Sequence, residues 1–210
     1  MYIRIDDIAH TWCAVATGAA IPKVEAVFCY DLKDGAPLGS GLGTPNSVHI
    51  PDKALSAALD GQRVVKVVHS HPNGSENVSL SAVDLAALWN YAGVVEIDAV
   101  LLDGSWFRAV RPAESARPWN EEVLFALDAI RRATKAEARI ERAICPDSSP
   151  DYALYNEIRT HVVCTALARL GKIYYETSVA QNRRMRWSAA QPLLNGWVDE
   201  VIAEYKRRNW

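Results

Sequence analysis

The segment that most constrains the fold is a short run of valines in the first half of the chain. Residues 64–68 read Val-Val-Lys-Val-Val. A short apolar run rich in β-branched residues is typical of a buried strand. Helix-like and strand-like segments alternate on both sides of this run up to residue 112. Such alternation predicts one α/β domain in which helices cover a sheet.

The other segments of this first part are predicted from periodicity and turn residues. The expected helices lie at 6–17, 52–59 and 80–91, and the expected strands at 1–5, 24–30, 64–68, 94–102 and 106–110. Asp103-Gly104 predicts a hairpin between the last two strands. The glycines at 39, 41 and 43 predict an open, turn-rich connection. Pro45 follows them instead of a helix, so a phosphate-binding loop is disfavoured.

After Pro112 the character of the chain changes. Helical patterns dominate, at 119–140, 152–170 and 191–208, with a loop at 145–150. Segment 182–187 combines arginines with a tryptophan, and we interpret it as a solvated turn between helices rather than a surface for an acidic partner or nucleic acid. The sequence therefore predicts a domain over residues 1–112 and a helical extension of unknown role over residues 113–210.

Composition disfavours several classes of protein. The formal net charge of −2 does not favour non-specific binding to nucleic acid. No stretch approaches the roughly 20 apolar residues of a membrane helix, and the N-terminus lacks the pattern of a secretory signal. The cysteines form no CxxC pair, which is typical of reduced thiols in a cytoplasmic protein and leaves any metal to other ligands. They are Cys13, Cys29, Cys145 and Cys164.

The valine run ends in two histidines one residue apart. Residues i and i+2 of a strand share one face, so His69 and His71 are expected to project together. Imidazole nitrogens suit zinc, and Asp84 could supply a third ligand if the intervening loop folds back. Three protein ligands would leave an open position for water, as a catalytic zinc site requires. A plainer interpretation stays open for Ser81 and Asp84, because this spacing is also that of a helix N-cap.

Together these residues resemble the motif of the JAMM zinc metalloproteases. That motif is an upstream glutamate, then His-Ser/Thr-His-Pro, a variable loop and Ser-x-x-Asp. This chain has His69-Ser70-His71-Pro72 and Ser81-Ala82-Val83-Asp84. The loop between the two halves is slightly longer than is usual in the family. The resemblance covers residues 1–112 and implies a compact MPN-type mixed sheet flanked by helices, here with a C-terminal helical extension.

The resemblance also implies roles for five side chains. Glu25 is the only glutamate among the first 75 residues, and it lies in an apolar, strand-like run about as far upstream of His69 as the family places its glutamate. It would be the general base that moves a proton from the attacking water to the leaving amine; a surface-facing strand position is the alternative. Zn²⁺ would be bound by His69, His71 and Asp84. Ser81 would donate a hydrogen bond to the developing oxyanion.

The function implied by the resemblance is that of a zinc-dependent isopeptidase or peptidase, with residues 1–112 as its catalytic domain. The chain is most similar to the smaller prokaryotic, deubiquitinase-like members. The substrate would be a ubiquitin-like protein or its conjugates, cleaved after the C-terminal glycine, with an E1-like conjugation enzyme as a further partner. Membrane and nucleic-acid partners are not implied. Two alternatives stay open: an MPN-type scaffold without catalysis, and a JAMM-type peptidase that acts on a cell-wall or phage peptide.

Outside the motif few residues are candidates for function. His10 and His161 lie in predicted helices and are interpreted as structural. His49 lies between apolar residues, and lining the cleft is a minor alternative for it. Asn73 and Glu76 fall in the loop beside the expected metal site, where a solvated loop is favoured over a substrate contact.

Overall fold

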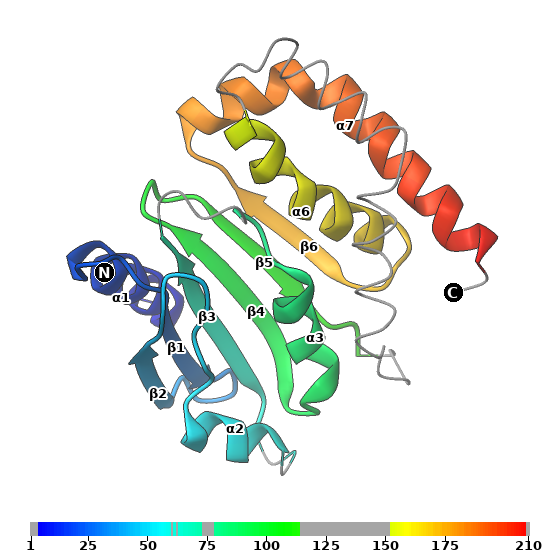
Figure 1. Ribbon diagram of the computed structural model, residues 1–210. Helices are drawn as coiled ribbons and strands as arrows, with labels where there is room; N and C mark the ends of the chain where they lie inside the picture. Colours follow the sequence, from blue (N-terminus) through cyan, green and yellow to red (C-terminus); the bar gives the residue numbers. More distant parts are fainter. Residues whose placement is uncertain (1–3, 60, 62, 73–77, 114–151, 209–210) are drawn as a thin grey trace.

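One six-stranded sheet is the centre of the fold (Figure 1). The computed structural model describes residues 4–59, 61, 63–72, 78–113 and 152–208. The strands are β1 (Ala26–Asp31), β2 (Pro37–Leu42), β3 (Val65–His71), β4 (Val94–Leu101), β5 (Trp106–Val110) and β6 (Tyr174–Ser178). Their spatial order is β2-β1-β3-β4-β5-β6, in which β3 and β4 are parallel and every other neighbouring pair is antiparallel. The predicted α/β fold with a mixed sheet is confirmed.

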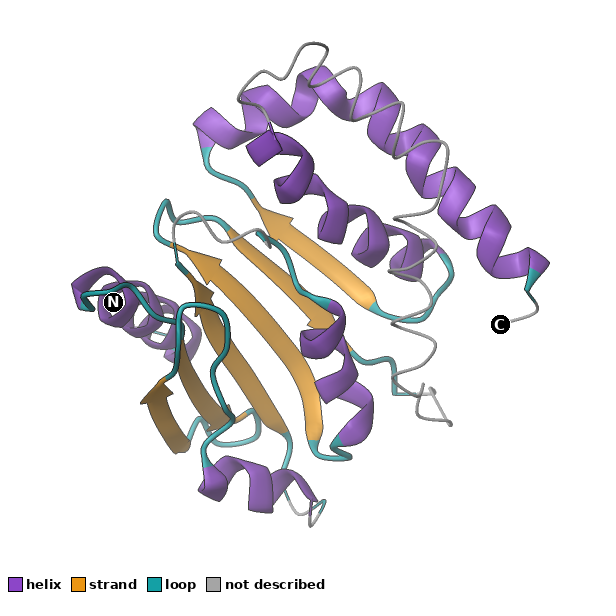
Figure 2. Cartoon of the chain, viewed as in Figure 1, coloured by secondary structure: helices purple, strands orange, loops and turns teal. Residues whose placement is uncertain are grey.

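Helices lie on both faces of this sheet (Figure 2). On one face, α1 (Ile5–Ala19) packs Ala9 and Cys13 against a small core that includes Val68 of β3. The other face carries a larger core shared by α2 (Asp52–Leu59), α3 (Ala82–Asn90), α6 (Tyr152–Arg169) and α7 (Gln181–Arg207). Because side chains alternate along a strand, neighbouring residues of β3 enter different cores. The sheet is therefore covered on both faces, which explains why β3 is buried along its whole length.

The lysine inside the valine run is paired beneath α1. Lys66 is fully buried, and its Nζ lies 2.6 Å from Asp6 Oδ1, 2.5 Å from Glu96 Oε1 and 2.8 Å from Asp98 Oδ2. Arg108 of β5 contacts the same three carboxylates at distances of 2.8 to 3.4 Å. A buried charge is tolerated only when it is paired and hydrogen-bonded. This network therefore accounts for a lysine in β3 and links α1 to three strands.

The C-terminal part supplies a strand as well as helices. Strand β6 pairs with β5 and so extends the sheet, and the rings of Phe107 in β5 and Trp187 in α7 lie 5.9 Å apart. Sequence analysis missed β6, because most of its residues, Tyr174 among them, are exposed or half-buried and show no apolar pattern. A division of the chain at residue 112 stays a prediction. The described C-terminal elements nevertheless share one core with the first part.

Two expectations for the N-terminal part are wrong. A strand was expected at residues 1–5, but Ile5 already belongs to α1, and residues 1–3 lie outside the described part of the chain. The glycine-rich segment expected as an open connection is the edge strand β2, which pairs with β1. Glycine has low strand propensity, so the local pattern hid a strand that pairing with β1 stabilises.

The last helix is longer than predicted. Helix α7 begins at Gln181 rather than at residue 191, so segment 182–187 is helical and not a solvated turn. Proline is favoured in the first turn of a helix, but Pro192 lies inside this one. The expected helix at 119–140 and loop at 145–150 lie outside the described residues.

The remaining predicted elements are confirmed to within a few residues. Helix α2 coincides with its predicted range, and β4 and β5 form the expected hairpin at Asp103-Gly104. Gly104 has φ +84°, a conformation that other residues adopt at a cost. Within the described part of the chain, no helix is both long enough and apolar enough to span a lipid bilayer. Cys13, Cys29 and Cys164 are buried free thiols.

Candidate metal centre

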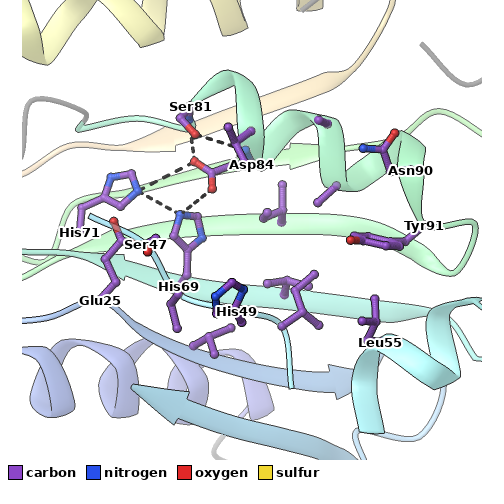
Figure 3. Close-up of a pocket in the computed structure, with 18 of the residues that line it drawn as sticks. Glu25, Ser47, His49, Leu55, His69, His71, Ser81, Asp84, Asn90 and Tyr91 are labelled. Carbon is purple, nitrogen blue, oxygen red and sulfur yellow. Dashed lines mark hydrogen bonds and ion pairs between the residues drawn. The ribbon is translucent and has the colours of Figure 1, made fainter. Parts of the chain in front are cut away.

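Strand β3 carries the histidine pair into the larger core. His69 and His71 lie on one face of the strand, and only 3% and 4% of their surfaces are exposed. Their Nε2 atoms are 3.0 Å apart, and the two rings meet edge to face. The expected same-face arrangement is therefore present, with both ring nitrogens directed at a common point (Figure 3).

The N-terminus of α3 brings a carboxylate to this point. Ser81 is the N-cap: its Oγ accepts a hydrogen bond from the Asp84 N–H at 3.2 Å, and its own N–H donates to Asp84 Oδ2 at 2.7 Å. Asp84 Oδ1 lies 3.3 Å from His69 Nε2, and Oδ2 lies 4.0 Å from His71 Nε2. The two interpretations of Ser-x-x-Asp are thus compatible, because the cap holds Asp84 Oδ2 on the side of His71 while the uncapped Oδ1 faces His69.

The three side chains have the spacing that a shared cation requires. A tetrahedral ion with ligand bonds of about 2 Å separates its ligand atoms by about 3.3 Å. The measured separations among His69, His71 and Asp84 run from 3.0 to 4.0 Å. Two neutral imidazoles and one carboxylate form a ligand set common in metal sites. The cluster could therefore hold a metal ion without rearrangement of the backbone.

Without an ion, the carboxylates and imidazoles of the centre shift one another's protonation. Burial alone would raise the pKa of Asp84, but His69, His71 and the Ser81 side chain hold that pKa well below its ordinary value. Burial alone would lower the pKa of His69, but Asp84 and Glu25 outweigh it and raise that pKa. The electrostatic potential at the centre therefore favours a positive charge, which a bound cation would supply in place of a proton.

Glu25 reaches the same centre from the segment just before β1. Its N–H donates to the Thr44 carbonyl at 2.8 Å, and its carbonyl accepts from the Gly43 N–H at 2.8 Å. The next residue, Ala26, donates its N–H to Ser70 Oγ in β3 at 2.9 Å. The serine between the two histidines thus helps to fix the backbone beside Glu25. The predicted strand position is close to correct, since Glu25 directly precedes β1.

The Glu25 carboxyl group is buried near the histidines, and only 8% of the residue is exposed. Figure 3 shows its side chain next to His71, on the opposite side from Ser81. Burial raises the pKa of Glu25 to about 7, and the negative charge of Asp84 adds to this rise while His69 opposes it. A carboxyl group with a pKa near neutrality can both accept and return a proton, as a general base must.

A cavity of about 1090 Å³ connects these residues to a more apolar region. It extends from Glu25 and His71 at one end to Leu55 and Tyr91 at the other (Figure 3). Its wall is formed by α3, α2, β3 and the segment after β2. All five predicted site residues line it: Glu25, His69, His71, Ser81 and Asp84. They therefore share one solvent-connected space, open to a substrate chain.

The cavity wall formed by residues 46–50 was largely missed by sequence analysis. Only His49 in this segment was considered, as a minor alternative, and it does line the cavity. The signal that could have found the segment is Gly43. A Cβ at that position would lie 2.0 Å from the Ser47 carbonyl oxygen, so only glycine permits this close approach. The turn that follows then directs residues 46–50 over the histidines.

A second cluster of histidine and aspartate side chains, which are residue types that can bind metals, lies on the opposite face of the sheet. Asp6, His10 and Asp98 also converge. However, Lys66 Nζ lies 2.6 Å from Asp6 and 2.8 Å from Asp98, and Arg108 contacts both. Side-chain cations thus already compensate this group. His10 Nε2 donates to the ionised Asp98 carboxylate at 2.7 Å, consistent with its predicted structural role.

The other candidates lie away from the metal centre. His161 is packed between Tyr175 and Trp187, with ring-centroid distances of 5.6 and 4.6 Å. Burial lowers its pKa to about 4, so it is neutral at physiological pH. Arg183 pairs with Asp103 at 2.9 Å, which ties the start of α7 to the β4–β5 hairpin. The predicted loop positions at 73 and 76 lie outside the described residues.

Comparison with known proteins gives no relative on which to base a function. No family model, no curated protein and no solved structure matches this chain. The function is therefore inferred from the geometry of the metal centre and the chemistry of its side chains.

Proposed function

We propose that this protein is a zinc-dependent amide hydrolase of the JAMM type, with an MPN-type fold. The observation that carries the proposal is the convergence of five side chains at one end of a single cavity: Glu25, His69, His71, Ser81 and Asp84. They come from separate segments of the chain, and each has the chemistry that its position requires. Chance packing rarely brings a buried carboxyl group of raised pKa next to a complete set of metal ligands.

The metal would be held by His69, His71 and Asp84, whose ligand atoms lie within 4.8 Å of one another. A set of two imidazoles and one carboxylate is one that suits zinc. When bound, Zn²⁺ polarises a carbonyl group and lowers the pKa of a coordinated water. Asp84 is kept ionised by the histidines and by the Ser81 side chain, so it is ready to bind a cation at neutral pH.

Proton transfer is assigned to Glu25. Its pKa of about 7 allows it to take a proton from the attacking water and to deliver that proton to the leaving amine. Ser81 is assigned to stabilise the oxyanion rather than to transfer a proton. Its Oγ accepts from the Asp84 N–H, which leaves the hydroxyl hydrogen to donate to the oxyanion that forms on the scissile carbonyl. No side chain needs to form a covalent bond to the substrate.

The substrate proposed is the C-terminal tail of a ubiquitin-like protein, joined to another protein or to a precursor extension. The long cavity supports this choice, because an extended and glycine-terminated tail can run past Leu55 and Tyr91 and place its last carbonyl at the metal. A cytoplasmic location and an E1-like conjugation partner belong to the same proposal.

The proposal is tested by metal analysis and cleavage assays on the full chain. We expect about one zinc per chain, cleavage of ubiquitin-like fusions, and loss of cleavage with a chelator that excess Zn²⁺ reverses. Glu25→Gln should keep the metal and lose turnover, whereas His71→Ala should lose both. If the protein binds zinc and binds the ubiquitin-like fusions but does not cleave them, it is a scaffold instead. Cleavage that survives both the chelator and Glu25→Gln would refute the mechanism.

A further inference from the structure

A buried polar cluster joins the C-terminal part of the chain to the segment that leads into α3. Tyr175 of β6 has its hydroxyl group 2.7 Å from Ser79 Oγ and 3.0 Å from His161 Nδ1. Cys164 of α6 lies one turn from His161, with its Sγ 3.8 Å from Ser79 Oγ and 3.7 Å from the Leu80 carbonyl oxygen. Two elements of the C-terminal part therefore hold two consecutive residues before the helix.

Burial keeps the ionisable members of the cluster uncharged. Burial lowers the pKa of His161 to about 4 and raises that of Tyr175 well above its ordinary value, so both are neutral at physiological pH. Ser79 can donate to the Tyr175 hydroxyl or to Cys164 Sγ, and His161 Nδ1 accepts from or donates to Tyr175 according to its tautomer. Buried polar groups are costly when unpaired, so each hydrogen bond restricts the next.

The segment that is held in this way leads directly to the metal centre. Ser79 and Leu80 are 0% and 1% exposed. The following residue, Ser81, caps α3, and its N–H fixes Asp84 Oδ2 at 2.7 Å. A shift of the backbone at Ser79 would move that N–H and thereby the carboxylate that faces the histidines.

We propose that Tyr175, supported by His161, is a positioning residue of the metal centre. Through Ser79 it sets the place of Ser81 and Asp84, so the C-terminal part of the chain tunes the metal affinity of a site to which its described residues, 152–208, contribute no ligand. The inference rests on the proposed metal site but not on the identity of the substrate. It assigns a role to residues 152–208, for which the sequence alone suggested none.

The size of the effect follows from the position of Tyr175 in the chain of contacts. Residues that hydrogen-bond a metal ligand typically alter metal affinity by about 10- to 100-fold when changed. Tyr175 acts through Ser79 and the helix cap, one step further out. We expect Tyr175→Phe to weaken Zn²⁺ binding by about tenfold or slightly less. Ser79→Ala should do the same, and the double variant should lose no more than either single variant, because both remove the Ser79–Tyr175 hydrogen bond through which Tyr175 acts.

The experiment measures Zn²⁺ affinity of the full chain by competition with a chromophoric chelator, for these three variants and a matched control. The control is Tyr30→Phe, which removes a buried hydroxyl that donates to Asp6 at 2.5 Å beneath α1, on the opposite face of the sheet. It should lower the melting temperature and leave Zn²⁺ affinity unchanged. Tyr175→Phe and Ser79→Ala should lower both.

A second measurement does not require any metal. Hydrogen exchange of the backbone amides of residues 78–85, in chelator-treated protein, should be faster in Tyr175→Phe and Ser79→Ala than in the wild type, and unchanged in Tyr30→Phe. If the variants of Ser79 and Tyr175 resemble the control in both measurements, the positioning role is refuted. If the wild type binds no zinc while exchange responds as expected, the proposed metal site fails but the coupling of β6 to α3 stands.

Discussion

Glu25 offers the sharpest test of the site, because its function should carry a cost in stability. The carboxyl group is 8% exposed, and burial raises its pKa from 4.5 to about 7. Above pH 7 the folded protein must keep a negative charge in this position, near the carboxylate of Asp84. Replacement by glutamine retains the shape and the hydrogen-bonding capacity but removes the charge. Glu25→Gln should therefore stabilise the metal-free protein at alkaline pH while it abolishes proton transfer.

The sign and size of the effect follow from proton linkage. Since the pKa of Glu25 is higher in the folded state, the folded protein binds more protons than the unfolded chain between pH 4.5 and about 7. Stability therefore falls as the pH rises through this window. One pKa unit corresponds to about 1.4 kcal/mol, so the full shift corresponds to about 3 kcal/mol. Water in the open cavity screens part of it, and we expect about 2 kcal/mol.

Urea denaturation of wild type and Glu25→Gln, with chelator present, measures this difference. The variant should gain about 2 kcal/mol relative to the wild type between pH 5 and pH 8, while the other titrating groups are common to both proteins and cancel. Bound Zn²⁺ lowers the pKa of Glu25, so the gain should shrink when the metal is restored. Parallel stability curves for the two proteins across this pH range would show that Glu25 is not buried as a charge beside the metal centre.

Three further changes probe other parts of the structure. Ser81→Ala should slow cleavage by about 10²- to 10³-fold. Loss of the helix cap in this variant should also lower the free energy of unfolding by about 1 kcal/mol. Ser81→Thr should keep the cap and lose less stability in urea denaturation. In the wild type, Zn²⁺ at a thousandfold excess over its Kd should stabilise the folded state by about 4 kcal/mol and so raise the melting temperature. In His69→Ala this zinc-dependent rise should vanish. Lys66→Met leaves Arg108 as the cation shared by the three carboxylates of the network beneath α1. It should destabilise the fold by about 3 to 5 kcal/mol. Zn²⁺ affinity of the folded fraction should not change, because Lys66 lies on the opposite face of the sheet.

The candidate metal centre could be predicted because its side chains follow local rules. The period of a strand places His69 and His71 on one face, and the spacing of a helix cap brings Asp84 back to Ser81. Glu25 required the family resemblance, since nothing local distinguishes it from a surface glutamate. The structure adds the backbone contacts that bring it to the histidines, through Thr44 and Ser70.

The features that were missed depend on contacts between distant segments. Strand β2 is rich in glycine and exists because β1 pairs with it, and β6 is a polar edge strand defined by its pairing with β5. The cavity wall at residues 46–50 depends on the close approach at Gly43. Lys66 looked like an interruption of an apolar run, and only the carboxylates of Asp6, Glu96 and Asp98 explain it.

Strand β6 has a consequence for how the protein is made on the ribosome. Its partner β5 ends at Val110, and β6 begins at Tyr174, so translation of the intervening chain takes several seconds at about 5 to 20 residues per second. During that interval β5 is an unpaired edge, and Phe107 lacks the cover of Trp187. We expect nascent chains arrested in this interval to bind chaperones that recognise exposed apolar strands, and release to follow the emergence of α7. Equal chaperone binding before and after that point would contradict this order of events.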